Sequence, residues 1–171
     1  MDARARPETA LGDCEAALSK APTSPSLRMD AILLLHRLGR AQEADSALSR
    51  LRAPAGGAMS LNNICYSLAA EGFHLQEALA DCNASLRLDP RSPATLDSRA
   101  FTLMRLGRNA EALAAYDAAL AAAPKLYIAL YGRGLVKKRL GRVKEGEHDQ
   151  SEALAASPGL RERFARMGIS E

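Results

Sequence analysis

The chain has 171 residues and a net charge of +3, with 47% hydrophobic and 25% charged residues. This composition is that of an ordinary globular domain and argues against a disordered chain, and the charge is too small to indicate nucleic acid or an anionic membrane by itself. The three cysteines form no CxxC pair, which argues against a disulfide-rich miniprotein and a standard zinc site.

The first predicted element is a helix over residues 7–22. Its sequence LGDCEAALSKAP, which ends at Pro22, aligns with LADCNASLRLDP, which ends at Pro90, and places Cys14 over Cys82. The later of these two segments closes a helical hairpin. The earlier one is therefore predicted to be the second helix of a hairpin whose first helix is missing.

Four helical hairpins are predicted to follow. The segments EALADCNASLRLDP and EALAAYDAALAAAP align without a gap at an offset of 34 residues, and Pro158 closes another segment after the same interval. Proline stops the second helix of the last three hairpins at Pro90, Pro124 and Pro158, and Gly56 stands at this place in the first. A glycine is predicted to end each first helix, at Gly39, Gly72, Gly107 and Gly141. The hairpins are expected over residues 25–56, 58–90, 93–124 and 127–158.

A short last helix is expected over residues 159–170, in the sequence GLRERFARMGI. Terminal repeats need a polar outer face, and the last hairpin is predicted to supply it through Glu147, His148 and Gln150. The apolar residues of the last helix are expected to cover the open end of the stack. These residues are Phe164, Met167 and Ile169.

A 34-residue period of paired helices resembles the tetratricopeptide repeat family. Its pattern of W-x2-L-G-x2-Y, A-x3-F and P is matched in part within residues 93–124. The matching positions are Leu96, Arg99, Ala100, Leu103, Ala112, Tyr116 and Pro124. The resemblance implies an all-α fold, a right-handed superhelical solenoid of antiparallel helix pairs with about ten helices. It also implies one domain over residues 1–171 that is not an enzyme.

The resemblance also indicates where a partner would bind. In this family the first helix of each pair lines the concave groove, which usually holds a peptide or a partner's helix. Side chains beside the core stripe of these helices are therefore candidate binding residues, and aromatic and Met side chains are good anchors. The alternative is that they only pack between neighbouring helices. The candidates are Asn62, Asn63, Tyr66, Asp97, Phe101, Met104, Tyr131, Leu135 and Lys138.

Other functions have weaker support in the sequence. The main alternative is an accessory segment of a larger enzyme or transporter, which positions that protein or self-associates through the ends of the stack. A basic cluster could meet phosphate, but such a run is more often a solvated helix end. No catalytic motif, cofactor site or metal-ligand cluster is recognised, and no small-molecule substrate or membrane span is expected. The basic cluster is Lys137, Lys138, Arg139, Arg142 and Lys144.

In the fold that the resemblance implies, Cys65 and Cys82 touch. One lies at a small core position of a first helix and the other on the core face of the following helix. Two buried thiols that pack as small apolar side chains are the simpler interpretation. A disulfide is the alternative, and it would indicate an oxidising compartment such as a periplasm. Without it the chain is expected to be cytoplasmic.

Overall fold

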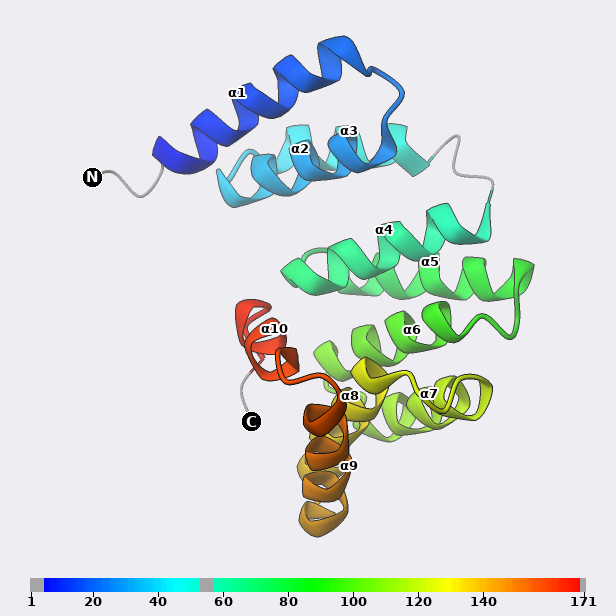
Figure 1. The fold of residues 1–171 in the computed structure, drawn as a ribbon. Helices are drawn as coiled ribbons and strands as arrows, with labels where there is room; N and C mark the ends of the chain where they lie inside the picture. The colour runs from blue at the N-terminus through cyan, green and yellow to red at the C-terminus, as the bar shows by residue number, and fades with distance from the viewer. Residues whose placement is uncertain (1–4, 53–56, 170–171) are drawn as a thin grey trace. The chain divides into compact units, whose positions relative to one another are not determined.

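The fold consists of α-helices arranged as antiparallel pairs (Figure 1). It is seen in a computed structural model that describes residues 5–52 and 57–169, and no strand occurs in these two stretches. An all-α helical-repeat fold, as predicted from the sequence, is therefore confirmed. The helices are α1 (Ala5–Lys20), α2 (Pro25–Arg37), α3 (Ala41–Arg52), α4 (Ala58–Glu71), α5 (Leu75–Leu88), α6 (Pro93–Arg105), α7 (Asn109–Ala122), α8 (Tyr127–Arg139), α9 (Val143–Ala156) and α10 (Leu160–Arg166).

The chain divides into two compact units where the sequence predicts one domain. The first unit spans residues 1–56 and the second spans residues 57–171. In the first unit α1 packs against α2, and α2 pairs with α3. The last four residues of the hairpin predicted over residues 25–56 lie outside the described residues. In the second unit each hairpin packs on the next, and α10 follows the last hairpin.

Capping residues mark both ends of several helices. Ser24 and Ser92 precede a proline and accept hydrogen bonds from the first turns of α2 and α6, as serine N-caps do. A left-handed glycine ends the first helix of every hairpin, as the sequence predicts. These glycines are Gly39, Gly72, Gly107 and Gly141.

The 34-residue period also appears in pairs of basic and acidic side chains at the start of the second helices, which were not identified from the sequence. Each second helix begins with a basic residue that contacts a glutamate three residues later. Most of these side chains are exposed, and His74 is 29% exposed, so the pairs mark the repeat more than they stabilise it. The pairs are Arg40–Glu43, His74–Glu77, Arg108–Glu111 and Arg142–Glu145.

A second recurring contact joins one hairpin to the next. Arg99 Nε on α6 donates to Asn83 Oδ1 on α5 at 2.9 Å. One period later, Arg133 Nη1 on α8 donates to Asp117 Oδ1 on α7 at 3.0 Å. The same arginine position therefore couples two successive hairpins of the second unit.

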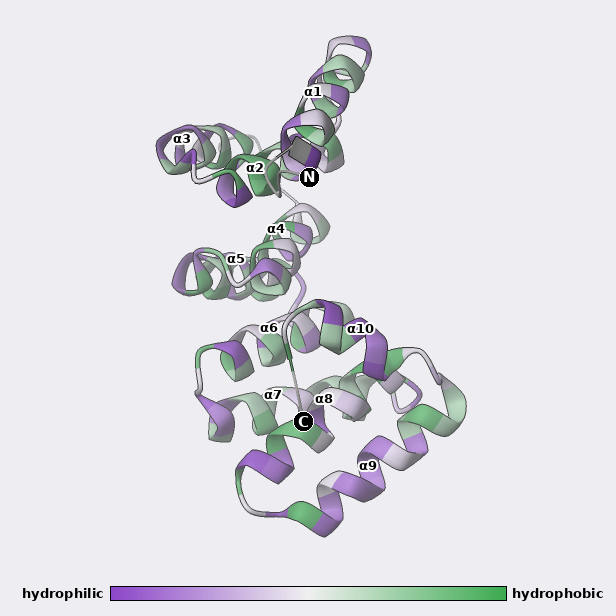
Figure 2. Cartoon of the chain, turned by 90° about the vertical axis from the view of Figure 1, so that its left-hand side faces the viewer, coloured by the Kyte–Doolittle hydropathy of each residue, from purple (hydrophilic) through white to green (hydrophobic). Residues whose placement is uncertain are grey.

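The last hairpin depends on a close approach of two glycines. A methyl group at Gly134 on α8 would lie 2.7 Å from the carbonyl oxygen of Gly146, and one at Gly146 on α9 would lie 2.5 Å from that of Gly134. Gly146 occupies a place where the family pattern has alanine, so this pair brings the two backbones unusually close. The approach also buries Gln150, which is 5% exposed. The prediction of a polar face is thus wrong for Gln150, whereas Glu147 and His148 are exposed on the largely hydrophilic α9 (Figure 2).

Replacing Gly134 with alanine is expected to lower the free energy of unfolding by about 1–3 kcal/mol, because backbone atoms obstruct the new methyl group. The matched control is Gly12, which also lies inside a helix but has nothing within 4 Å of an added Cβ. Gly12→Ala should raise stability by roughly 0.5–1 kcal/mol. Urea titration of both variants checks the opposite signs. An equal, stabilising effect at both positions would contradict the close approach.

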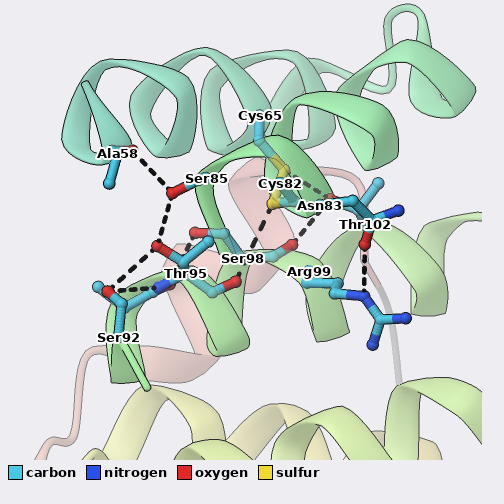
Figure 3. Close-up of a disulfide and its surroundings, with 11 residues drawn as sticks. Ala58, Cys65, Cys82, Asn83, Ser85, Ser92, Thr95, Ser98, Arg99 and Thr102 are labelled. Atoms are coloured by element: carbon cyan, nitrogen blue, oxygen red, sulfur yellow. Dashed lines mark hydrogen bonds between the residues drawn. A yellow bond between two sulfur atoms is a disulfide. The ribbon is translucent and has the colours of Figure 1, made fainter. Parts of the chain in front are cut away.

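A disulfide joins α4 to α5 (Figure 3). The bond links Cys65 and Cys82, whose Cα atoms are 5.4 Å apart, and both side chains are fully buried. The contact predicted from the sequence is present, but the simpler interpretation of two unbonded thiols is wrong. The reason is that the two positions face each other at a separation that a disulfide can span.

The disulfide lies beside a row of hydroxyl groups where α6 packs on the α4–α5 hairpin (Figure 3). The Oγ of Ser85 donates to the carbonyl of Ala58 at 2.7 Å and lies 3.2 Å from Thr95 Oγ1. Thr102 Oγ1 donates to the carbonyl of Ser98 at 2.7 Å. The buried hydroxyl groups of Ser85 and Thr102 therefore have hydrogen-bond partners in the protein, and the row contributes to the packing of α6 on this hairpin.

Reduction of the Cys65–Cys82 bond is expected to lower the free energy of unfolding by about 3 kcal/mol, the effect of closing a loop of this size. Denaturant titration with and without a phosphine reductant measures the change, and the Cys14→Ser variant should show the same change because Cys14 is free. Thiol titration of the unreduced, denatured chain is expected to detect Cys14 alone. Detection of all three cysteines would contradict the bond.

Candidate binding face

The first helices of the second unit, α4, α6 and α8, present one aromatic surface. We call this surface the first-helix face and define it by Tyr66 on α4, Asp97 and Phe101 on α6, and Tyr131 on α8. The rings of Tyr66 and Phe101 have centroids 6.2 Å apart. Two of the candidate binding residues, Tyr66 and Phe101, are therefore brought together in the structure.

The C-terminal helix α10 lies on this face. The ring of Phe164 makes an edge contact with Phe101 at a centroid distance of 5.9 Å and a tilted contact with Tyr131 at 4.9 Å. Phe164 is 2% exposed, and Leu160, one turn earlier, is also buried. Both views show α10 turning back from α9 toward the first helices (Figures 1 and 2).

Polar contacts fix the orientation of α10. Arg163 Nη2 donates to the Tyr66 hydroxyl at 2.8 Å, and its guanidinium carbon lies 5.9 Å from the centroid of the Tyr66 ring. The same hydroxyl lies 3.8 Å from Met167 Sδ. Arg105 Nη1 on α6 donates to the carbonyl oxygen of Met167 at 2.5 Å, which caps the end of α10 with a positive charge.

This position corrects the prediction that Phe164, Met167 and Ile169 cover the open end of the stack. Phe164 and Met167 contact the first-helix face instead, and Ile169 belongs to the same buried cluster as Phe101 and Tyr131. The physical reason is that the face offers aromatic rings to the apolar side of α10, whereas α9 presents mostly polar residues.

The predicted binding residues differ in accessibility. Phe101, Met104, Tyr131 and Leu135 are buried, the first and third of them in contact with Phe164. Asn62, Tyr66, Asp97 and Lys138 are partly buried, and Asn63 is exposed. Lys138 Nζ donates to Gln150 Oε1 at 3.3 Å, toward α9. The role of the nine predicted binding residues in binding stays a prediction.

Two residues that hold α10 were not recognised as site residues from the sequence. Arg163 and Phe164 lie five and six residues after Pro158, the proline that ends the last hairpin. The i, i+4, i+7 spacing of Leu160, Phe164 and Met167 was the available signal, because it places three apolar side chains on one side of a helix. That spacing does not say which surface the helix covers.

The carboxyl group of Asp97 is unusually hard to ionise. Burial raises its pKa from the ordinary 3.8 to about 7, and the positive charge of Arg163 opposes only part of this shift. The charged and titratable groups that interact with it are Arg163 from α10 and Tyr116 from α7. Burial also raises the pKa of Tyr116, with a further contribution from the charge of Asp97.

Because the pKa of Asp97 is raised on folding, its contribution to stability is complete below about pH 4 and is lost as the pH rises toward 7. Asp97→Asn removes the charge, so we expect it to raise the free energy of unfolding at pH 8 by roughly 2 kcal/mol. This is less than the full shift would give, since the side chain is partly exposed. Urea titrations at pH 4 and pH 8 measure both effects, and a variant less stable than the wild type at pH 8 would contradict this.

The basic cluster of the last hairpin is largely occupied by internal contacts. Lys137 is 8% exposed, and its Nζ lies 2.8 Å from Asp149 Oδ2. Arg142 pairs with Glu145, and Arg139 Nη1 donates to the carbonyl of Met104 at 3.3 Å. The basic side chains at this helix end therefore bind other residues of the same chain.

The described ranges contain no group of three or more His, Cys, Asp or Glu side chains arranged to hold a metal ion. Nor do they contain a helix with the length and apolar content that crossing a membrane requires.

The repeated hairpins and their recurring contacts define a helical-repeat protein. Residues 95–126 match the family model of the tetratricopeptide repeat. This match covers the α6–α7 hairpin, and the solved structures described next share the fold of the chain. No curated protein sequence matches it.

Three solved structures illustrate the shared fold. A thermophilic tetratricopeptide repeat protein from Thermus thermophilus is 24% identical, with 96% of this chain and 92% of that chain covered and a TM-score of 0.66. MamA from Desulfovibrio magneticus is 15% identical, with coverages of 89% and 86% and a TM-score of 0.61. YrrB, described as a tetratricopeptide repeat protein with an unusual peptide-binding site, is 16% identical, with coverages of 96% and 84% and a TM-score of 0.60.

Proposed function

We propose that the chain is a non-enzymatic interaction module that binds a segment of a partner protein on its first-helix face. One observation carries the proposal: this face already holds a helix, α10, through ring contacts with Phe101 and Tyr131 and a hydrogen bond to Tyr66. Aromatic side chains with a polar end are frequent anchors at protein interfaces. The peptide-binding site named for YrrB, which shares the fold, is consistent with it.

The test is a selection of helical peptides from a random library against the full chain, carried out on the wild type and on the Phe164→Ala variant. Hydrogen exchange then locates the bound peptide. We expect protection of amides in α4, α6 and α8, where the first-helix face lies.

A matched pair of substitutions makes the test specific. Tyr66→Ala removes a ring of the face and should weaken a selected peptide by at least about tenfold, as hot-spot aromatic residues do. Leu88→Ala removes a side chain that is 58% exposed on α5 and should leave the affinity unchanged. Peptides that protect only α5, α7 and α9, or that depend on Leu88, would refute the proposed face.

A further inference from the structure

We propose that α10 is a built-in competitor for the first-helix face, and that the partner is an amphipathic helix with the chemistry of α10. That chemistry is three apolar residues at positions i, i+4 and i+7 and an arginine at i+3. The proposal rests on the proposed function of the face and adds the kind of partner and the way that access is controlled.

The contacts of α10 are those of a docked ligand. Its ring contacts and side-chain hydrogen bonds go to Tyr66, Phe101, Arg105 and Tyr131 on the three first helices. A helix as short as Leu160–Arg166 is not stable alone in water. We therefore attribute its helical state to docking on the face.

The two sides of α10 differ in polarity. Leu160 and Phe164 are buried against the face, and Met167 is partly buried. The other side chains of the helix are exposed, and they are Arg161, Glu162, Arg163, Ala165 and Arg166. A partner that copies the buried side could replace α10 without creating an unpaired charge, since the arginine at i+3 would again meet the Tyr66 hydroxyl.

Charge complementarity specifies the arginine. Asp97 is the carboxyl group of the first-helix face, and the charge of Arg163 acts on it across the contact. The Tyr66 hydroxyl accepts from the same guanidinium. An acidic residue at this position of a partner would meet a carboxyl group instead, so the face selects against acidic helices.

One buried acceptor on α4 lacks a hydrogen-bond partner in the described part of the chain. Asn62 lies one helical turn before Tyr66 on α4, and its buried Oδ1 has no hydrogen-bond partner in the part of the chain that is described. A partner that donates to this oxygen gains an interaction that α10 does not supply. The additional hydrogen bond would increase the affinity of a free partner. This gain would offset the high effective concentration of α10, which is attached to the same chain.

The test uses a fluorescent synthetic peptide of residues 158–171 and the full chain. If α10 covers the face in most molecules, few molecules can bind the peptide and its apparent Kd is high. Weakening the contact of α10 should therefore lower the apparent Kd. Arg163→Ala and Phe164→Ala in the chain are expected to tighten peptide binding by at least about tenfold relative to the wild type. Arg163 is exposed, so its substitution keeps the fold even where that of Phe164 does not.

Two controls accompany these variants. Arg166→Ala removes another exposed arginine of α10 and should bind the peptide as the wild type does. A peptide that carries Phe164→Ala should not bind any of the variants, because it lacks the ring that contacts Phe101 and Tyr131.

The outcomes separate this inference from the proposed function. Equal peptide affinity for the wild type and both loosened variants overturns the competitor role while the face remains a binding site. Library peptides that bind the face without the α10 pattern overturn the partner chemistry alone. Failure of every peptide to bind any variant overturns both. Light scattering that shows dimers exchanging α10 would identify a second copy as the occupant and would also overturn the inference.

Discussion

Replacing Asp149 with alanine is expected to lower the free energy of unfolding of the second unit by about 3–5 kcal/mol. Asp149 is 3% exposed, and Arg133 donates to both of its oxygens, at 2.7 and 3.0 Å. Lys137 Nζ lies 2.8 Å from the same carboxylate. Without Asp149, the buried ammonium group of Lys137 has no negative partner and lies near the positive charge of Arg133. Leaving a buried charge unpaired in this way is strongly destabilising.

The matched control is Asp117, which binds the same Arg133 from the other side. Its side chain is 54% exposed, so Asp117→Ala should cost less than about 1 kcal/mol. Urea titration of the two variants compares a buried and an exposed partner of one arginine. Equal losses would show that burial of Asp149 does not decide the effect.

The effect of pH on Asp149 has the opposite sign to that on Asp97. Burial alone raises the pKa of Asp149, but hydrogen bonds from Arg133 and Lys137 outweigh it, and the pKa lies below its ordinary value of 3.8. The stability that this residue contributes is therefore present above that value and is lost as the pH falls through the lower folded pKa. The Asp149→Asn variant should lose this acid sensitivity.

Replacing Phe101 with alanine is expected to cost about 3–5 kcal/mol, because the ring is 3% exposed and its removal leaves a cavity between α6 and α10. The sequence analysis places Phe101 and Tyr131 among the candidate binding residues, with packing between helices as the alternative. Both rings are buried and contact Phe164 in the structure.

The control for Phe101 is Met59, an apolar residue of α4 that is 76% exposed. Met59→Ala should change the free energy of unfolding by less than about 0.5 kcal/mol. Phe101→Ala should also increase hydrogen exchange throughout α10, whereas Met59→Ala should not. A stable Phe101→Ala variant with a protected α10 would contradict the described packing.

The repeat made much of the fold predictable. A period of 34 residues with its closing Pro90 and Pro124 located the hairpins, since proline cannot continue a helix. Gly39 and Gly107 located the turns, since glycine adopts the left-handed conformation that ends a helix. Local backbone chemistry repeats with the sequence, so these features could be predicted without knowledge of long-range contacts.

The position of α10 could not be predicted in this way. Leu160, Phe164 and Met167 indicate an amphipathic helix, but the same pattern suits the open end of a stack and the first-helix face equally. The choice depends on contacts between residues far apart in the sequence, such as Arg163 with Tyr66. The bond between Cys65 and Cys82 was uncertain for a related reason, because a sequence shows that two cysteines can meet and not whether they are oxidised.

The central claim is that α10 rests on the first-helix face in the free chain. Nuclear Overhauser measurements on the full-length protein test this claim directly, since the ring centroids of Phe164 and Tyr131 are 4.9 Å apart. The structure predicts cross-peaks between these two rings within an isotope-labelled chain. In a labelled Arg163→Ala chain, these intramolecular cross-peaks should disappear when the unlabelled peptide of residues 158–171 is added in excess. The absence of such cross-peaks in the free wild-type chain, together with unprotected amides throughout α10, would contradict it.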